Sequence, residues 1–290
     1  MQSVLITGSN SGIGRAAALR LAMAGYRVYA AMRDLSKAKK LLDLAREAGC
    51  AVEPLELDVT DAGSVRRAIG TVCARPEGLD ILINNAGIGW NAAIEDVDVD
   101  AARVVFDTNY WGTLRCIHAA LPHMRERGSG QIVNVSSIAG RIAALAQTVY
   151  ASSKWALECL SENLAQEVAP FGIRVVIIEP GVTRTAILPK NVGHPEPTAY
   201  ETAYRRMLQF YLKGIEANVA ADTVADTILD ALTDDAPRLR YACGWGGSEI
   251  AEGRARMTDA EWIALGRCET DEEYYDAFER HLGLDLRPSS

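Results

Sequence analysis

The sequence predicts an α/β protein in which helices flank both faces of a doubly wound, mostly parallel sheet. Over the first two thirds of the chain, short apolar runs alternate with stretches of helical periodicity. The apolar runs carry few charges, which is typical of strands covered on both faces. Repeated strand–helix units require right-handed crossovers, so the strands are expected to lie parallel in one sheet.

Each expected element has its own signal in the chain. Apolar runs predict strands at residues 4–6, 28–31, 52–57, 79–83, 132–135 and 175–178, and residues 238–241 fit a final strand. Helical patterns lie between them at 12–24, 36–48, 61–74, 101–127 and 149–168. Gly25 and Gly49 follow the first two helices, where glycine commonly ends a helix.

The last third of the chain is organised differently. Three prolines (Pro189, Pro195 and Pro197) interrupt a loop, and helical stretches follow at about 198–213 and 222–232. After Gly244 the chain is polar and rich in helix formers, with no Ser/Gly linker and no sign of a separate core. We therefore expect one domain over residues 1–290, made of a cofactor-binding and catalytic core (1–185), a helical substrate lid (186–218) and a C-terminal extension (244–290).

Composition excludes several classes of partner. The formal net charge of −8 argues against nucleic-acid binding and against docking on an anionic membrane. The six cysteines are scattered without a C-x-x-C pair, and the histidines lack metal-like spacing, so no metal is expected. No apolar run is long enough to span a bilayer, and the N-terminus lacks a signal-peptide pattern. We expect a cytoplasmic protein.

A glycine-rich turn follows the first strand and opens the first helix. Gly8 allows a tight turn, Gly12 allows backbone N–H groups to approach a pyrophosphate, and Gly14 allows close packing of helix and strand. The diphosphate would sit at the positive end of the helix. The alternative is a structural turn without a ligand. The expected contacts are Gly8, Ser9, Asn10, Ser11, Gly12, Ile13 and Gly14.

Two further segments lie where a dinucleotide would need them, at the carboxyl edge of the sheet. Asp58 and Val59 follow the third strand, where a carboxylate can accept hydrogen bonds from the adenine amino group. Asn84-Asn85-Ala86-Gly87 follows the fourth strand, and Asn85, Ala86 and Gly87 are expected to contact the cofactor. The alternatives are an ordinary turn residue for Asp58 and local backbone capping for the asparagines.

The end of the second strand selects between NAD and NADP. An acidic residue there would bond the adenine ribose hydroxyls and repel a 2′-phosphate, but this chain has Arg33, whose forked donors can pair with that phosphate. Asp34 is adjacent and is compatible with either cofactor, and Arg15 adds positive charge. We expect NADP(H), with NAD possible; the alternative is that Arg33 is a solvated loop charge.

Four residues form a proton-handling set. Tyr150 and Lys154 are four residues apart near the start of a helix and share one face, Ser137 closes the fifth strand, and Asn109 lies in the preceding helix. Hydride transfer to a ketone leaves an oxyanion, and a tyrosine hydroxyl can protonate it. A neighbouring ammonium and an oxidised nicotinamide would favour the phenolate, whose ordinary pKa of about 10 is too high for an efficient base.

The other members of the set have supporting roles. Lys154 can also hold the nicotinamide ribose, Ser137 can hydrogen-bond the substrate oxygen, and Asn109 can hold a water that relays protons to Lys154. Alone, Tyr-x-x-x-Lys indicates only a pair on a helix surface; the order of the other motifs makes it informative. Ser136 competes with Ser137, which we prefer for its spacing from Tyr150, and Ser153 reads as an ordinary helix residue.

Together these motifs resemble the short-chain dehydrogenase/reductase family over roughly residues 2–185. The resemblance implies a seven-stranded Rossmann sheet, hydride transfer, and homodimers or homotetramers built from the two long helices. It also assigns Pro180 and Gly181 to the family's Pro-Gly motif, and brings Val182 and Thr183 near the nicotinamide amide. Residues 27–35 and 150–158 look like the 17-beta-hydroxysteroid dehydrogenase and retinol dehydrogenase branch, where the arginine favours NADP(H) and substrates are bulky and apolar.

The segment after Gly181 is expected to cover the substrate with apolar side chains. It offers Ile187, Leu188, Tyr200, Tyr204, Met207, Leu208, Phe210 and Tyr211. Among these we expect the pocket to use Ile187, Leu188, Tyr204 and Leu208, together with Ser137 and Trp90. The alternative is a helix that packs its apolar face on the core.

The predicted function is therefore NADP(H)-dependent interconversion of a secondary alcohol and a ketone or aldehyde. Two other functions compete with it. A nucleotide-binding regulator could keep the fold without turnover, but it would not need Tyr150, Lys154, Ser137 and Asn109 together. An NAD-dependent dehydrogenase or epimerase on the same scaffold is the other, although nucleotide-sugar enzymes tend to have longer C-terminal domains and a different glycine turn.

Overall fold

The structure is a computed structural model that describes residues 1–185 and 199–289. A seven-stranded sheet forms its centre, in the order β3-β2-β1-β4-β5-β6-β7, with every neighbouring pair parallel. This confirms the predicted doubly wound sheet. The strands are β1 (Ser3–Thr7), β2 (Arg27–Met32), β3 (Val52–Glu56), β4 (Ile81–Asn84), β5 (Gly130–Val135), β6 (Ile173–Pro180) and β7 (Arg240–Cys243).

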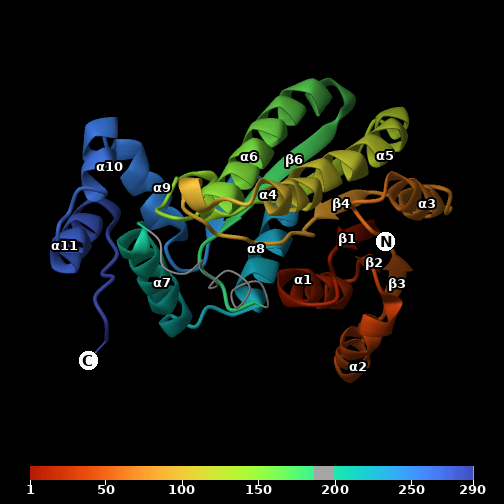
Figure 1. Cartoon of the computed structure of the whole chain (residues 1–290). Coiled ribbons are helices and arrows are strands. Elements are labelled where there is room, and N and C mark those ends of the chain that lie inside the picture. Colours follow the sequence, from red (N-terminus) through yellow and green to blue (C-terminus); the bar gives the residue numbers. More distant parts are fainter. Residues whose placement is uncertain (186–198, 290) are drawn as a thin grey trace.

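The helices connect the strands and then continue beyond the sheet (Figure 1). Those of the first two thirds are α1 (Gly12–Met23), α2 (Lys39–Glu47), α3 (Ala62–Cys73), α4 (Val99–Phe106), α5 (Gly112–Arg127) and α6 (Thr148–Val168). Those of the last third are α7 (Glu201–Glu216), α8 (Ala221–Thr233), α9 (Gly247–Arg256), α10 (Asp259–Leu265) and α11 (Asp271–Leu282). None of the helices within the described ranges is both long and apolar enough to cross a membrane.

One predicted helix is interrupted. The pattern at 101–127 predicts a single helix, whereas the structure has α4, then a π-helical turn, η3 (Asp107–Trp111), and then α5. π-helical turns inside α-helices are often found at functional sites because they alter the regular backbone hydrogen bonding. The turn contains Asn109, which is buried.

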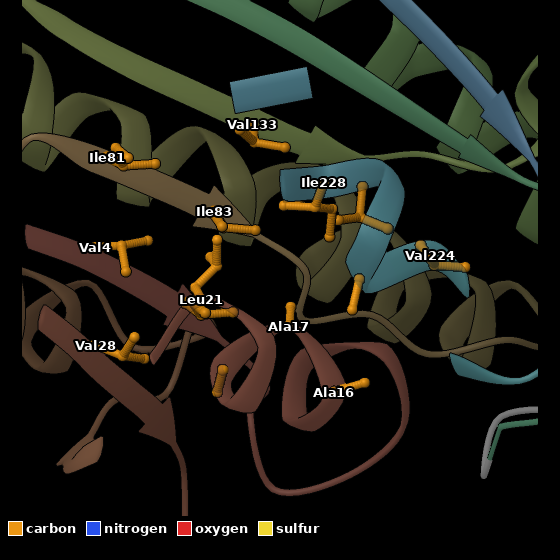
Figure 2. Packing of buried hydrophobic residues seen from close by; sticks show 14 of the residues in the cluster. Val4, Ala16, Ala17, Leu21, Val28, Ile81, Ile83, Val133, Val224 and Ile228 are labelled. Carbon is orange, nitrogen blue, oxygen red and sulfur yellow. The ribbon is translucent and has the colours of Figure 1, made fainter. Parts of the chain in front are cut away.

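Strand alternation divides the core between the two faces of the sheet. Val4 and Ile6 face one side, where α1 and α8 cover them, and Figure 2 shows their cluster. Leu5 faces the other side and packs with residues of α3, α5 and α6. Both faces are therefore apolar, as expected for a parallel sheet between two helical layers.

A third hydrophobic cluster contains the buried apolar residues of the region after Gly244, together with residues of α7 and of the catalytic core such as Ile138 and Val182. Residues of α7 pack there with those of α9, α10 and α11, which lie together beside one end of the sheet (Figure 1). Its buried aromatic members are Tyr204, Phe210, Tyr211, Tyr274, Tyr275 and Phe278. The C-terminal helices thus hold α7 by burying aromatic side chains.

A buried arginine reinforces this third cluster. Arg206 is only 2% exposed, donates to Asp271 and to the carbonyls of Cys268 and Thr270, and stacks on Tyr274 with 4.6 Å from its guanidinium carbon to the ring centroid. Because its donors have partners, the guanidinium can be buried without an uncompensated charge. Arg206 thereby joins α7 to the start of α11.

Candidate active site

A cleft of about 960 Å³ opens at the carboxyl ends of the strands. It lies where the strand order reverses between β1 and β4, the place where open α/β sheets bind ligands. Most of the site residues predicted from the sequence line this cleft. These are Gly8, Asn10, Ser11, Gly12, Ile13, Arg33, Asp58, Val59, Asn85, Ala86, Gly87, Ser137, Tyr150, Lys154, Pro180, Gly181, Val182 and Thr183.

The glycine turn is shaped as a cradle. Gly8 has φ +72°, and a Cβ there would lie 2.9 Å from the Cα of Ala86, so only glycine allows this approach of the two loops. Ser11 precedes α1 in an extended conformation and makes no side-chain cap. The first-turn N–H groups of α1 therefore have no capping side chain and can serve a diphosphate. The cradle fits a dinucleotide.

Two of the nominated residues of the turn do not line the cleft. Ser9 is fully buried, and its hydroxyl donates to the carbonyl of Ile6. Gly14 lies under the turn, where a Cβ would come within 2.4 Å of the Gly8 oxygen and of Asn85 Nδ2. Their roles are to build the turn, because neither faces the space that a ligand would take.

Thr7 and Asn85 tie the two loops of the cleft together. Thr7 Oγ1 accepts from the amides of Asn85 and Ala86, at 3.0 Å each, and Asn85 Nδ2 donates to the Thr7 carbonyl at 2.9 Å. These bonds fix the loop after β4 against the glycine turn after β1. Asn85 therefore bonds a distant loop rather than capping its local backbone, and it also lines the cleft.

The adenine end of the cleft is basic on one side. Arg33 and Lys37 both line it, and Arg33 has no hydrogen bond or ion pair within the described part of the chain. The Asp34 carboxylate instead accepts from the Ser36 amide and hydroxyl and lies 3.6 Å from Lys37 Nζ. These hydrogen bonds from Ser36 hold the pKa of Asp34 below its usual value. Asp34 therefore serves to start the turn that precedes α2.

Asp58 and Val59 line the same end of the cleft. The Asp58 carboxylate accepts from the amide and the hydroxyl of Thr60, at 2.9 Å and 2.7 Å, so it also shapes the turn before α3. The geometry is therefore compatible both with a contact to the adenine amino group and with an ordinary turn residue.

Tyr150 and Ser137 meet in the middle of the cleft. Burial raises the pKa of the Tyr150 phenol above its ordinary value of 10.0, while a hydrogen bond with the Ser137 hydroxyl lowers it and Tyr211 raises it. Ser137 Oγ also accepts from the Ala139 amide at 3.1 Å, which fixes its direction. Ser137 is thus the serine beside the phenol, while Ser136 is buried next to Glu158.

Lys154 lies one helical turn beyond Tyr150, with its Nζ 5.8 Å from the centroid of the tyrosine ring. Nζ donates to the Val135 carbonyl at 2.8 Å, and the residue is only 5% exposed. Burial lowers the pKa of Lys154 from 10.5 to about 8, and the Glu158 carboxylate opposes that shift. We expected the amine to acidify the phenol; in the protein without cofactor, burial instead raises the pKa of the phenol.

Asn109 is placed behind the cleft rather than on its wall. Its amide donates to the Ile88 carbonyl and to Ser153 Oγ, and accepts from the Ile88 amide. The side chain that we expected to hold a relay water is therefore occupied by protein groups. Ser153, which the sequence marked as ordinary, is the residue that completes this anchor.

The substrate end of the cleft differs from the expectation. Trp90, Tyr204 and Leu208 do not line it. The Tyr204 hydroxyl accepts from the Ala93 amide and donates to Asp96, so this side chain locks α7 onto the loop after β4. Leu208 packs in the third cluster instead. Ile187 and Leu188 lie outside the described residues.

Other side chains take those places. Phe210 and Tyr211 of α7 and Gln147 before α6 line the cleft, and Asn91 Nδ2 donates to the Tyr211 hydroxyl at 3.0 Å. Phe210 and Tyr211 were among the apolar residues offered by the lid, but helical periodicity alone did not select them. Gln147 and Lys37 carried no motif. Within the described ranges, no group of three or more His, Cys, Asp or Glu side chains is placed to hold a metal ion.

Sequence comparisons relate the chain to known oxidoreductases. A model of the short-chain dehydrogenase family matches residues 2–195. Human 17-beta-hydroxysteroid dehydrogenase type 1 is 40% identical over 215 residues, which make up 72% of this chain and 65% of that enzyme. Bovine retinol dehydrogenase 8 is 40% identical over 184 residues, or 62% of this chain and 58% of that protein. The matches thus span less than two thirds of both relatives.

Solved structures agree with the architecture. A short-chain dehydrogenase from Streptomyces avermitilis has a TM-score of 0.78 and 34% identity, covering 92% of this chain and 98% of its own. A short-chain dehydrogenase/reductase from Burkholderia phymatum, in complex with NAD, has a TM-score of 0.75 and 25% identity, covering 93% of this chain and 96% of its own. A gluconate 5-dehydrogenase from Burkholderia cenocepacia, in complex with NADP and tartrate, has a TM-score of 0.71 and 28% identity, covering 84% of this chain and 94% of its own.

Proposed function

We propose, from the premise that this chain belongs to the short-chain dehydrogenase/reductase family, that it interconverts a secondary alcohol and a ketone or aldehyde with NADP(H). One observation carries the proposal: Tyr150, Ser137 and Lys154 line the same cleft as the glycine turn. The bound cofactor would supply or accept the hydride, and the protein must then manage one proton and hold the substrate oxygen.

The residues divide this work by position. The Tyr150 hydroxyl would give its proton to the substrate oxygen during reduction and take it back during oxidation. Ser137 would hydrogen-bond the same oxygen, because it already contacts the phenol. Lys154 would stabilise the phenolate that remains after proton transfer, since an ammonium nearby lowers its energy. Burial raises the pKa of the phenol, so the hydroxyl carries the proton that reduction of a ketone requires.

The preference for NADP(H) rests on charge at the adenine end of the cleft. Arg33 and Lys37 line that end, and Asp34, the nearest carboxylate in sequence, is occupied by Ser36. A 2′-phosphate would meet two cations there, and a forked guanidinium suits it well. Similar solved structures carry NAD in one case and NADP in another, so they support a nicotinamide cofactor without selecting one.

A bulky apolar substrate is our proposal for the other end. Phe210, Ile88, Val182 and Ile138 contribute apolar wall, and Tyr211 adds a polar edge. Relatives named as hydroxysteroid and retinol dehydrogenases support the same class. α7 carries Phe210 and Tyr211, which supports its assignment to a lid over the catalytic core.

We also propose a cytoplasmic homo-oligomer. All six cysteines are free thiols, as expected in a reducing compartment. Large apolar side chains remain exposed on α4, η3 and α6, among them Val104, Trp111 and Trp155.

A substrate screen tests the proposed function. Steroid, retinoid and aryl ketones are offered with NADPH and with NADH, and turnover is followed at the nicotinamide absorbance band. We expect consumption of NADPH with at least one bulky ketone and slower consumption of NADH. Binding of NADPH without turnover of any ketone or alcohol would instead support a nucleotide-binding regulator.

A further inference from the structure

A buried ion cluster lies one helical turn beyond Lys154. It consists of Glu158 on α6, Glu179 on β6, Arg240 on β7 and Arg141 after β5. Arg240 Nε lies 3.0 Å from Glu158 Oε2 and 3.1 Å from Glu179 Oε1, and Arg141 lies 2.9 Å from the same Glu179 oxygen. Glu158 and Glu179 are only 5% and 2% exposed. The two arginines are partly exposed, at 34% for Arg141 and 25% for Arg240, but burying two carboxylates is expensive, so this cluster calls for an explanation.

The cluster is in contact with the catalytic end of the cleft. A Cβ placed on Gly140 would meet Glu158 Cγ at 2.9 Å, Ser136 Oγ at 2.9 Å and the Lys154 carbonyl at 3.2 Å, so these groups converge on one point. Ser136 and Lys154 both line the cleft. Lys154 and Glu158 are four residues apart on α6 and therefore share a face of the helix.

The charged and titratable groups of this region come from several elements. Tyr150 and Glu158 lie on its own helix, Glu179 on β6, Arg240 on β7, Arg141 after β5, and Tyr211 on α7 next to Tyr150. Glu179 Oε1 is shared by two arginines, so its charge is already balanced. Glu158 Oε1 is buried and makes no well-aligned hydrogen bond within the described part of the chain. Glu158 is therefore the carboxylate whose negative charge is less fully balanced by arginine and can act on Lys154.

We propose that Glu158 is a positioning residue that keeps the Lys154 side chain as an ammonium, and that Arg240 holds the carboxylate in place for this task. The role deepens the proposed function, on which its catalytic meaning rests. An ammonium is what Lys154 needs to stabilise a phenolate on Tyr150, and a neutral amine would lose that effect.

The direction of the pKa shifts supports this assignment. Burial lowers the pKa of Lys154 to about 8, and Glu158 is the charge that opposes the fall. Burial raises the pKa of Glu158 in turn, while Ser136 and Arg240 lower it. The serine and the arginine thus help to keep Glu158 ionised.

A titration of Lys154 tests the proposal without turnover. In protein labelled with 13C-lysine, the Cε signal of Lys154 is assigned by its loss in Lys154→Met and followed against pH. Glu158→Gln should lower the pKa of Lys154 by about one unit, a tenfold change in its proton affinity. Glu162→Gln is the matched control, because Glu162 also binds Arg240, at 2.7 Å, but is 53% exposed one turn farther along α6. It should leave the Lys154 titration unchanged.

The pH profile of ketone reduction gives the second readout. In Glu158→Gln the fall of kcat/KM at high pH should begin at lower pH than in the wild type, with little change in NADPH affinity. If Glu158→Gln does not fold, Glu158→Asp replaces it and should give a smaller shift of the same sign. Equal titration of Lys154 in wild type and Glu158 variants, or an equal shift in Glu162→Gln, would overturn the proposal. Because the titration needs no substrate, it stays decisive even if no ketone is turned over.

Discussion

Asn109 and Ile88 are joined by two hydrogen bonds, each 2.9 Å long: the Asn109 amide donates to the Ile88 carbonyl and accepts from the Ile88 amide. A third bond links Asn109 to Ser153 Oγ on α6. One buried side chain in the π-helical turn thus holds the loop after β4 against the helix that carries Tyr150 and Lys154. The cofactor loop and the proton-handling residues share a single support.

Replacement of Asn109 should destabilise both the loop after β4 and its attachment to α6. Asn109→Ala leaves the part-buried amide and carbonyl of Ile88 unpaired, which should lower the free energy of unfolding by up to about 1–3 kcal/mol for each group left without a partner. Thermal unfolding and NADPH binding would measure the loss. Asn163→Ala removes an exposed asparagine of α6 that bonds only within its own helix, and should change neither. Equal melting temperatures for wild type and Asn109→Ala would contradict this role.

The basic pair at the adenine end should select the cofactor. Arg33→Ala should raise the KM for NADPH on the order of 10- to 100-fold, the loss expected for a charge-assisted hydrogen bond, and should barely change that for NADH. Lys37→Ala should have a smaller effect of the same kind. Lys39→Ala is the control, because Lys39 pairs with Asp43 on the surface of α2 and does not line the cleft. Equal increases for both cofactors would argue against a 2′-phosphate site.

The buried arginine of α7 should matter more than its exposed neighbour. Arg206→Ala leaves Asp271 and two carbonyls without their buried partner, so we expect a loss of about 3–5 kcal/mol in unfolding free energy. Because α7 carries Phe210 and Tyr211, the KM for the ketone should rise as well. Arg205→Ala removes an exposed partner of the same Asp271 and should cost far less. Denaturant unfolding of the two variants would separate these outcomes.

Burial of Lys154 predicts a pH-dependent stability. The unfolded chain keeps the lysine proton up to about pH 10.5, whereas the folded protein loses it near pH 8, so the unfolded state binds more protons between these values. The contribution of Lys154 to stability therefore rises with pH across that window. Lys154→Met has no amine to deprotonate or bury, so its stability should not change in this way. The difference in unfolding free energy between Lys154→Met and the wild type should therefore shift in favour of the wild type by about 3 kcal/mol from pH 8 to pH 10.5. A difference in unfolding free energy that is independent of pH would contradict the shift.

The sheet was readable from the sequence because buried parallel strands are continuous apolar runs, and β4 to β6 stand out for that reason. The interruption of the helix at 101–127 was not readable. Thr108 and Tyr110 flank Asn109 without a helix breaker, and the π-helical turn carries tertiary bonds from Asn109 to Ile88. Such bonds depend on a segment 21 residues away and leave no local pattern.

The start positions of two C-terminal helices could have been predicted from the sequence, although the polar composition of this region drew attention away from them. Thr258 with Glu261 and Thr270 with Glu273 form capping boxes that start α10 and α11. The cluster they help to build contains scattered aromatic residues, such as Tyr274 and Phe278, which become a core only when α7 packs on them.

The motifs predicted the cofactor and proton-handling parts of the site because they are local in sequence and tied to strand ends. The substrate end could not be predicted in the same way. Whether Tyr204 or Tyr211 faces the cleft depends on the rotation of α7, which is fixed by Arg206 and by the bond from Ala93 to Tyr204. These contacts join distant segments, so helical periodicity alone left the choice open.

The most direct measurement is the rate of ketone reduction by Tyr150→Phe beside its affinity for NADPH. Removal of one hydroxyl should lower kcat/KM on the order of 100- to 10,000-fold, the usual size of a proton-transfer contribution, while fluorescence titration shows nearly unchanged NADPH binding. Wild-type turnover in this variant would mean that another group handles the proton, and the account of the site would fail.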